Sequence, residues 1–147
     1  MAAENEIEIA APPDRVWAVL ADPENFDDWV VGAQNVRDAD ANWPAVGSKL
    51  HHSSGVGPLT IDDETQVEIS NAPTQLVLLA KVGAAGKFRI TLDLRATAAG
   101  TTLWMHEEAV AGLADHVPGT DSAVHVRNDI SLERLKGLAE GTRAAGR

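Results

Sequence analysis

The central part of the chain alternates apolar and polar residues, and this alternation limits what the chain can fold into. In the segment LTIDDETQVEIS, residues 59–70, polar residues occupy one face, and the other face carries Ile61, Asp63, Thr65, Val67 and Ile69. A period of two residues is typical of a β-strand with one buried and one solvated face. The segment KFRITLDLRAT, residues 87–97, repeats the pattern. We therefore expect a sheet that is covered on one face only.

Short turn signals separate the expected strands between about residues 36 and 110. They are SGVGP at 54–58, NAPT at 71–74, GAAG at 83–86 and AAGT at 98–101. Turns of this length join neighbouring strands in opposite directions. Together with the alternating segment NEIEIA at the start of the chain, they predict an antiparallel sheet of six to seven strands.

Helices are expected on either side of these strands. After the first strand, Pro12 and Pro13 suit a first helical turn, Pro23 marks a break, and a second short helix carries Phe26 and Trp29. A long helix is expected from about Asp121 to Glu140, with Gly141 as its stop. At about 3.6 residues per turn, one side of it carries Val124, Asn128, Ser131, Leu132, Leu135, Leu138 and Ala139.

The long helix is the only expected element large enough to cover the sheet. The predicted fold is therefore α+β, a curved antiparallel sheet wrapped around a long C-terminal helix, with two short helices after the first strand. The apolar side of the long helix is interrupted in its N-terminal half, because Asn128 and Ser131 stand where core leucines would be expected.

Composition narrows the possible functions. The 147 residues, 44% of them hydrophobic, suit one globular domain, 1–147. The chain has no cysteine, no signal-peptide pattern and no run of about 18 apolar residues, so we expect a cytoplasmic location without stable membrane insertion. A net charge of −10 repels nucleic acids and anionic membrane surfaces. It leaves a neutral or apolar small molecule, or another protein, as the expected partner.

The order of these elements resembles a known superfamily. The segments PPDRVWAVLADPENFDDW, VGSKLHH, VGPLTIDDET and HVRNDISLERLKGLAE are similar to those of bacterial members of the polyketide cyclase/START-related lipid-transfer superfamily (SRPBCC), which has the helix-grip fold. This resemblance implies a cavity between sheet and long helix that is open near the short helices. Family members bind sterols, lipids, polyketides and other hydrophobic molecules there. Some are cyclases or aromatases and many are carriers, so the fold alone does not settle function.

We expect ligand contacts from the residues that face this cavity. They are Phe26, Trp29, His52, Asp63, Thr65, Leu78, Ile90, Leu92, Met105, Glu107, Val124, Asn128 and Ser131. Phe26 and Trp29 suit a packed core as well as an entrance wall. Asn128 and Ser131 are equally consistent with bonds to backbone or to buried water.

The adjacent histidines, His51 and His52, raise the question of a metal site. Neighbours on a strand point to opposite faces, so these two cannot bind one metal without distortion. We therefore expect neither a metal nor another cofactor. If SGVG closes a hairpin, His52 pairs near Leu59 or Thr60.

Two carboxylates are expected at inward positions. Asp63 shares the apolar face of its strand, and a buried carboxylate is costly unless it is paired. It either bonds a backbone group, Lys49 or a histidine for structure, or contributes a polar group to the cavity. Glu107 shares its parity with Leu103 and Met105, which are expected inside. It either reaches solvent at the strand end or faces the cavity.

Three functions follow from these features. The first is a binding module, a carrier or sensor for a hydrophobic small molecule. The alternative is an enzyme of the polyketide cyclase, aromatase or dehydratase type. It would use Asp63 or Glu107 as the base and His52, Asn128 or Ser131 as the donor. The third is a protein-interaction role supported by Val126 and Ile130, which face away from the apolar side of the helix. A monomer and a homodimer both remain open.

Overall fold

The computed structural model describes residues 1–56 and 59–141. The strands are β1 (Ala2–Ile9), β2 (Ala33–Ala39), β3 (Lys49–Val56), β4 (Leu59–Asn71), β5 (Gln75–Val82), β6 (Gly86–Thr97) and β7 (Gly100–Ala111). The α-helices are α1 (Pro13–Ala21), α2 (Phe26–Trp29) and α3 (Thr120–Glu140). Short 3₁₀ helices follow at η1 (Pro23–Asn25), η2 (Gly83–Ala85) and η3 (Leu113–His116).

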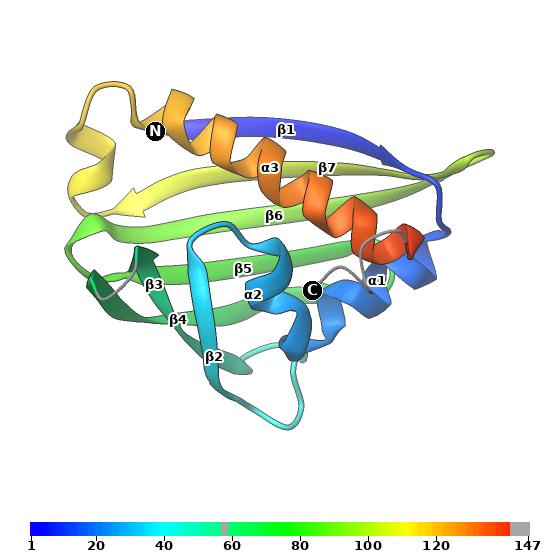
Figure 1. Ribbon diagram of the computed structural model, residues 1–147, viewed down its shortest axis with the longest axis horizontal. Helices are drawn as coiled ribbons and strands as arrows, with labels where there is room; N and C mark the ends of the chain where they lie inside the picture. Colours follow the sequence, from blue (N-terminus) through cyan, green and yellow to red (C-terminus); the bar gives the residue numbers. More distant parts are fainter. Residues whose placement is uncertain (57–58, 142–147) are drawn as a thin grey trace.

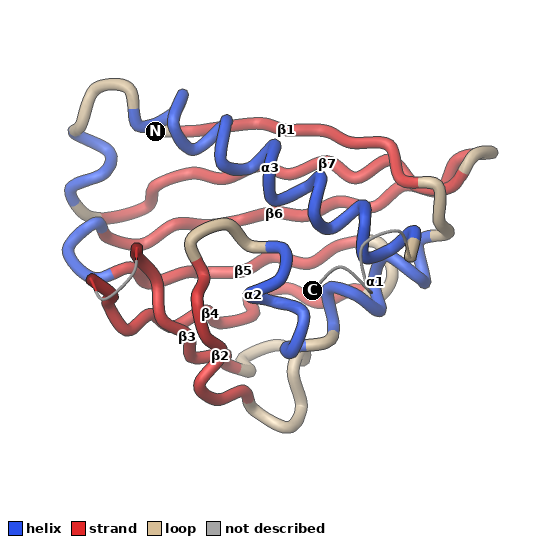
Figure 2. Tube along the Cα trace, viewed as in Figure 1, coloured by secondary structure: helices blue, strands red, loops and turns tan. Residues whose placement is uncertain are grey.

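The strands form one antiparallel sheet in the order β1-β7-β6-β5-β4-β3-β2. Every strand from β2 onward therefore pairs with its neighbour in sequence, and β1 closes the far edge against β7. The three α-helices lie on the same side of the curved sheet, with α3 crossing it beside β1 (Figures 1 and 2). The predicted α+β helix-grip fold is confirmed.

The long helix has the predicted length and stop. It runs from Thr120 to Glu140, and Gly141 follows it with a φ of 78°. Glycine suits this left-handed conformation because it has no Cβ to clash. The N–H of Gly141 donates to the carbonyls of Gly137 and Leu138, which would otherwise lack partners at the helix end.

The packed core lies under the C-terminal half of α3. Its largest fully buried side chains include Ile9, Val16, Leu50, Val67, Leu76, Leu92, Leu103, Leu132 and Leu135. Burying a side chain of this size contributes about 1.5–3 kcal/mol. The guanidinium of Arg15 donates to the carbonyls of Leu138 and Ala139, each at 3.1 Å, and so ties α1 to the end of α3.

One predicted detail of β4 is wrong. Ile69 was expected inside but is 41% exposed, because a register shift between Val67 and Ile69 reverses which side chains of the strand face outward beyond this point.

The expected pairing of His52 with Leu59 or Thr60 is also wrong. β3 continues to Val56, which pairs with Leu59, and this register places His52 opposite Asp63. Gly57 and Pro58 of the predicted turn lie outside the described residues.

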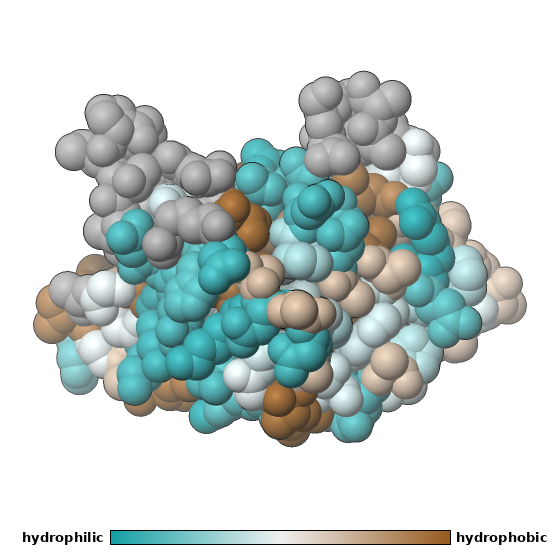
Figure 3. All heavy atoms as spheres, turned by 90° about the horizontal axis from the view of Figure 1, so that it is seen from below, coloured by the Kyte–Doolittle hydropathy of each residue, from teal (hydrophilic) through white to brown (hydrophobic). Residues whose placement is uncertain are grey.

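One face of the molecule carries many hydrophilic side chains, and its apolar side chains form separate patches (Figure 3). Val126 and Ile130 are 58% and 45% exposed, as their position on the helix predicts. Within the described part of the chain, no helix combines the length and the apolar composition that crossing a bilayer requires.

Candidate functional site

A cavity of about 470 Å³ lies between the N-terminal half of α3 and the sheet, next to α2. Its volume is within the range of small-molecule sites. Apolar and aromatic side chains form most of its wall, among them Phe26, Trp29, Leu78, Val82, Phe88, Ile90 and Met105. The cavity exists where the apolar side of α3 is interrupted, since Asn128 and Ser131 are too short and polar to fill the space as leucines would.

The structure brings most of the predicted contact residues together around this cavity. Those that line it are Phe26, Trp29, His52, Asp63, Thr65, Leu78, Ile90, Met105, Glu107, Asn128 and Ser131. Leu92 and Val124 do not line it. Leu92 is fully buried in the packed core, and Val124 is partly exposed near the start of α3.

Asp63 is a buried carboxylate in the wall, on β4. Asp63 is only 2% exposed, and neither of its carboxyl oxygens has a hydrogen-bond partner among the residues that the structure describes. The predicted structural partner Lys49 lies instead 3.6 Å from Glu64 on the outer face. Withdrawing a carboxylate from water without a donor costs several kcal/mol. Asp63 therefore has unused capacity to accept hydrogen bonds in the cavity.

His52 lies opposite Asp63 on the neighbouring strand and is also buried. Its Nε2 is 3.3 Å from the Thr65 hydroxyl oxygen. The imidazole centroid lies 4.9 Å from the ring centroid of Phe26. Phe26 in turn meets Trp29 edge to face at 5.9 Å. These contacts hold an aromatic wall beside Asp63.

Glu107, on β7, is buried but paired. Its Oε1 accepts a 2.5 Å hydrogen bond from Nη2 of Arg127 and a 3.2 Å bond from Nδ2 of Asn128. Arg127 also donates to Oδ1 of Asn128. The alternative in which Glu107 reaches solvent is wrong, since the residue is 3% exposed. The three side chains join β7 to α3 across the cavity.

Sequence reasoning missed Arg127 because it lies beside, and not on, the apolar side of the helix. A signal was available. An inward Glu107 needs a cation, and a long arginine next to the cavity-facing Asn128 can supply one. Arg127 remains partly exposed while its guanidinium reaches the buried carboxylate.

Ser131 has a structural bond within the cavity wall. Its hydroxyl oxygen accepts the backbone N–H of Val31 at 3.0 Å, which fastens the segment after α2 to α3. The alternative in which Ser131 bonds backbone is therefore confirmed. Its small side chain still leaves space that a leucine would occupy.

The two adjacent histidines point to opposite faces, as predicted. His52 is buried in the cavity wall, whereas His51 lies on the outer face opposite Glu64. The pKa of Glu64 is lowered from its ordinary value, chiefly by a hydrogen bond from Lys81, with Lys49 and His51 adding smaller attractions. Over residues 1–56 and 59–141, no group of three or more His, Asp or Glu side chains is placed to hold a metal ion.

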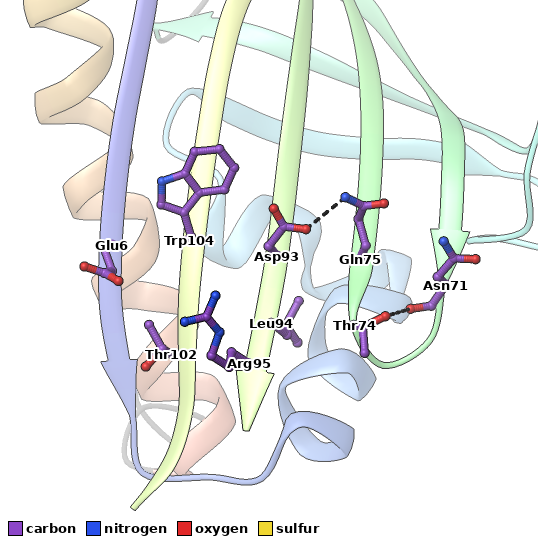
Figure 4. A pocket seen from close by; sticks show the side chains of 9 residues that line it. All are labelled: Glu6, Asn71, Thr74, Gln75, Asp93, Leu94, Arg95, Thr102 and Trp104. Carbon is purple, nitrogen blue, oxygen red and sulfur yellow. Dashed lines mark hydrogen bonds between the residues drawn. The ribbon is translucent and has the colours of Figure 1, made fainter. Parts of the chain in front are cut away.

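A second depression, about 670 Å³, lies on the opposite face of the sheet. Figure 4 shows its polar lining, in which Gln75 donates to Asp93 at 2.9 Å. Trp104 lies on this outer face and stacks on His106 at 5.6 Å between centroids. The neighbouring Leu103 and Met105 are buried, so the predicted parity of β7 is confirmed. The depression is open and its side chains come from the solvated face, which makes the inner cavity the stronger candidate site.

A curved antiparallel sheet closed by a long helix over an inner cavity defines a helix-grip protein of the SRPBCC superfamily. The chain belongs to the family described as polyketide cyclase/dehydrase and lipid transport, whose model matches residues 2–140. No curated protein matches the sequence.

Solved structures with the same fold are distant in sequence. A Chromobacterium violaceum protein is 19% identical, with a TM-score of 0.75, over 95% of this chain and 98% of that one. An AHSA1-like protein from Aeromonas hydrophila is 20% identical, with a TM-score of 0.69, over 99% and 94%. DynU16, from the dynemicin biosynthetic locus, is 16% identical, with a TM-score of 0.71, over 95% of this chain and 48% of its own. At these identities the likeness shows the fold alone.

Proposed function

We propose that the protein binds a hydrophobic small molecule in the cavity between the sheet and α3, as a carrier or sensor. The observation that carries this proposal is the apolar cavity of about 470 Å³ with a few polar groups turned into it. Such a wall gains contact area when an apolar body fills it, and the polar groups orient that body. Family membership supports the same reading.

Native mass spectrometry of the freshly purified protein tests this proposal. We expect a bound mass that disappears after organic extraction, and rebinding of a hydrophobic ligand by the extracted protein. A purified protein that shows no bound ligand mass, and that binds no hydrophobic ligand after extraction, would contradict the proposal.

A matched pair of variants assigns the binding to this cavity. Ala80 lies in its wall, so Ala80→Phe should fill part of the space and abolish the bound mass. Ala98 is exposed in the turn between β6 and β7, and Ala98→Phe should leave the bound mass unchanged. Equal retention of the mass by both variants would place the ligand elsewhere.

An enzyme of the cyclase or dehydratase type is the second candidate. One observation favours one of the two expected bases over the other. Asp63 has free oxygen lone pairs at the cavity, whereas Glu107 is engaged by Arg127 and Asn128. Asp63 is therefore the better base for removing a proton next to a carbonyl. If the protein turns over a polyketide-like substrate, Asp63→Asn should abolish the turnover. Unchanged turnover in both Asp63→Asn and Glu107→Gln would exclude these two residues as the base.

A further inference from the structure

The two acidic side chains of the cavity differ in their partners. Glu107 is paired with Arg127. Asp63 is 2% exposed, and neither of its oxygens has a hydrogen-bond partner in the part of the chain that the structure describes. His52 lies opposite Asp63 on the neighbouring strand, and its Nε2 is 3.3 Å from the Thr65 hydroxyl oxygen. Both Asp63 oxygens are therefore open to a hydrogen-bond donor in the cavity.

A buried carboxyl group without a donor selects among ligands. A ligand carboxylate offers Asp63 no donor and brings a second acidic group into an apolar wall, so it should bind weakly. A neutral hydroxyl can donate one hydrogen bond. An ammonium group can donate to both oxygens, and its hydrogen bonds to a carboxylate are charge-assisted, which makes it the strongest partner that Asp63 can accept.

Two further features favour a cation at this position. Phe26 and Trp29 lie in the same wall, and aromatic rings attract cations through their negative faces. The whole chain carries a net charge of −10, which raises the local concentration of cations and lowers that of anions.

We infer that the ligand is an apolar amine, with a primary or secondary ammonium group at Asp63 and an apolar body against Leu78, Ile90 and Met105. This inference rests on the proposed function, because it names the chemical class of the molecule that the cavity binds. Arg127 and Asn128 lie across the cavity and remain engaged with Glu107.

Titration calorimetry with three compounds of one skeleton tests the inference. The probes are 2-naphthylmethylamine, 2-naphthylmethanol and 2-naphthoic acid, titrated into extracted wild-type protein, Asp63→Asn and the control Asp62→Asn. Asp62 is exposed on the outer face of the same strand, so both variants lose one charge. For the wild type we expect the amine to bind about 10- to 100-fold more tightly than the alcohol, and the acid to bind most weakly.

The variants separate a contact with Asp63 from a general preference for cations. Asp63→Asn should bind the amine no more tightly than the alcohol, while Asp62→Asn should keep the wild-type order. If Asp63→Asn does not fold, as judged by circular dichroism, NMR of the wild-type Asp63 carboxyl decides. Its carbon resonance should shift more with the amine than with the alcohol.

Equal binding of the amine and the alcohol to the wild type would overturn the inference while leaving the proposed function intact. An amine preference that survives Asp63→Asn would also overturn the inference and leave the proposed function intact. An unshifted carboxyl resonance in the amine complex would have the same meaning. A co-purified ligand that proves to be an acid or a neutral lipid would also overturn it. If none of the three compounds binds and no mass co-purifies, both the inference and the proposed function fail.

Discussion

The two halves of α3 cover the same sheet with different chemistry. In the C-terminal half, Leu132, Leu135 and Leu138 are buried as part of the packed hydrophobic core. In the N-terminal half, Asn128 and Ser131 are equally buried, yet they border a cavity of about 470 Å³. Burial alone therefore does not distinguish a filled core from a binding site.

The size and polarity of the helix residues make the difference. Leucines fill the space beneath the helix and gain free energy from apolar burial. Asparagine and serine leave space, and their polar atoms bond Glu107 and the Val31 N–H. One half of the helix is thus built for stability, and the other holds a cavity with ordered polar walls. Substitutions in the two halves should have different consequences.

The largest effect is expected in the packed half. Leu135 is fully buried, so Leu135→Ala should lower the free energy of unfolding by about 2–5 kcal/mol through lost burial and a new void. Urea unfolding followed by circular dichroism measures this. Leu113→Ala is the control, since Leu113 is 62% exposed and its loss should change the value by less than about 0.5 kcal/mol. Similar losses in the two variants would mean that Leu135 contributes no more to stability than an exposed leucine does.

A smaller effect is expected where β7 meets the cavity half of α3. Arg127→Met removes the cation from the buried Glu107 and should lower the free energy of unfolding by about 1–3 kcal/mol. The loss is moderate because the arginine side chain is partly exposed. Adding Glu107→Gln should recover part of the stability, since the buried charge is then gone. A double variant that is less stable than Arg127→Met would refute this account of the pair.

Ser131→Ala should have a weaker effect in the same half. The substitution leaves the N–H of Val31 without its acceptor at little cost in packing, which should lower the free energy of unfolding by about 1 kcal/mol. Hydrogen exchange of the Val31 amide gives a direct readout, and it should become faster. Ser122→Ala, at an exposed position near the start of α3, serves as the control. Unchanged protection of Val31 would mean that the hydroxyl does not hold this segment.

The sequence predicts the architecture well because periodicity reports which side of each element is buried. Residues 59–70 and 87–97 alternate, and the long helix stops at Gly141 as its pattern indicates. Two of the failures share one cause. The bulge before Ile69 and the pairing of His52 with Asp63 depend on strand register, which short turns leave open. Periodicity also misses contacts made at a distance, so it could not show that Arg127 reaches Glu107 or that Asp63 is left without a partner.

The smallest effect is expected on the outer face of β4, where Glu64 contrasts with its inward neighbour Asp63. Glu64 lies 3.1 Å from Lys81 and 3.6 Å from Lys49, and its pKa is lowered from its ordinary value of 4.5, chiefly by the hydrogen bond from Lys81. A lowered pKa in the folded state means that this carboxylate stabilises the fold above its unfolded pKa. That contribution is lost as the pH falls through the folded value. Because the groups are partly exposed, Glu64→Gln should cost only about 0.2–1 kcal/mol at neutral pH.

Urea unfolding of the wild type and Glu64→Gln at neutral and acidic pH tests this contrast between the two faces of β4. The difference in the free energy of unfolding should shrink as the pH is lowered below 4.5, because the wild-type carboxyl becomes protonated and loses its attraction to the lysines. Added salt should shrink it at neutral pH as well, since exposed charges are screened. Glu133→Gln, an exposed position on α3, controls for the loss of one charge. A difference that stays constant with pH and salt would mean that Glu64 acts through packing and not through its charge.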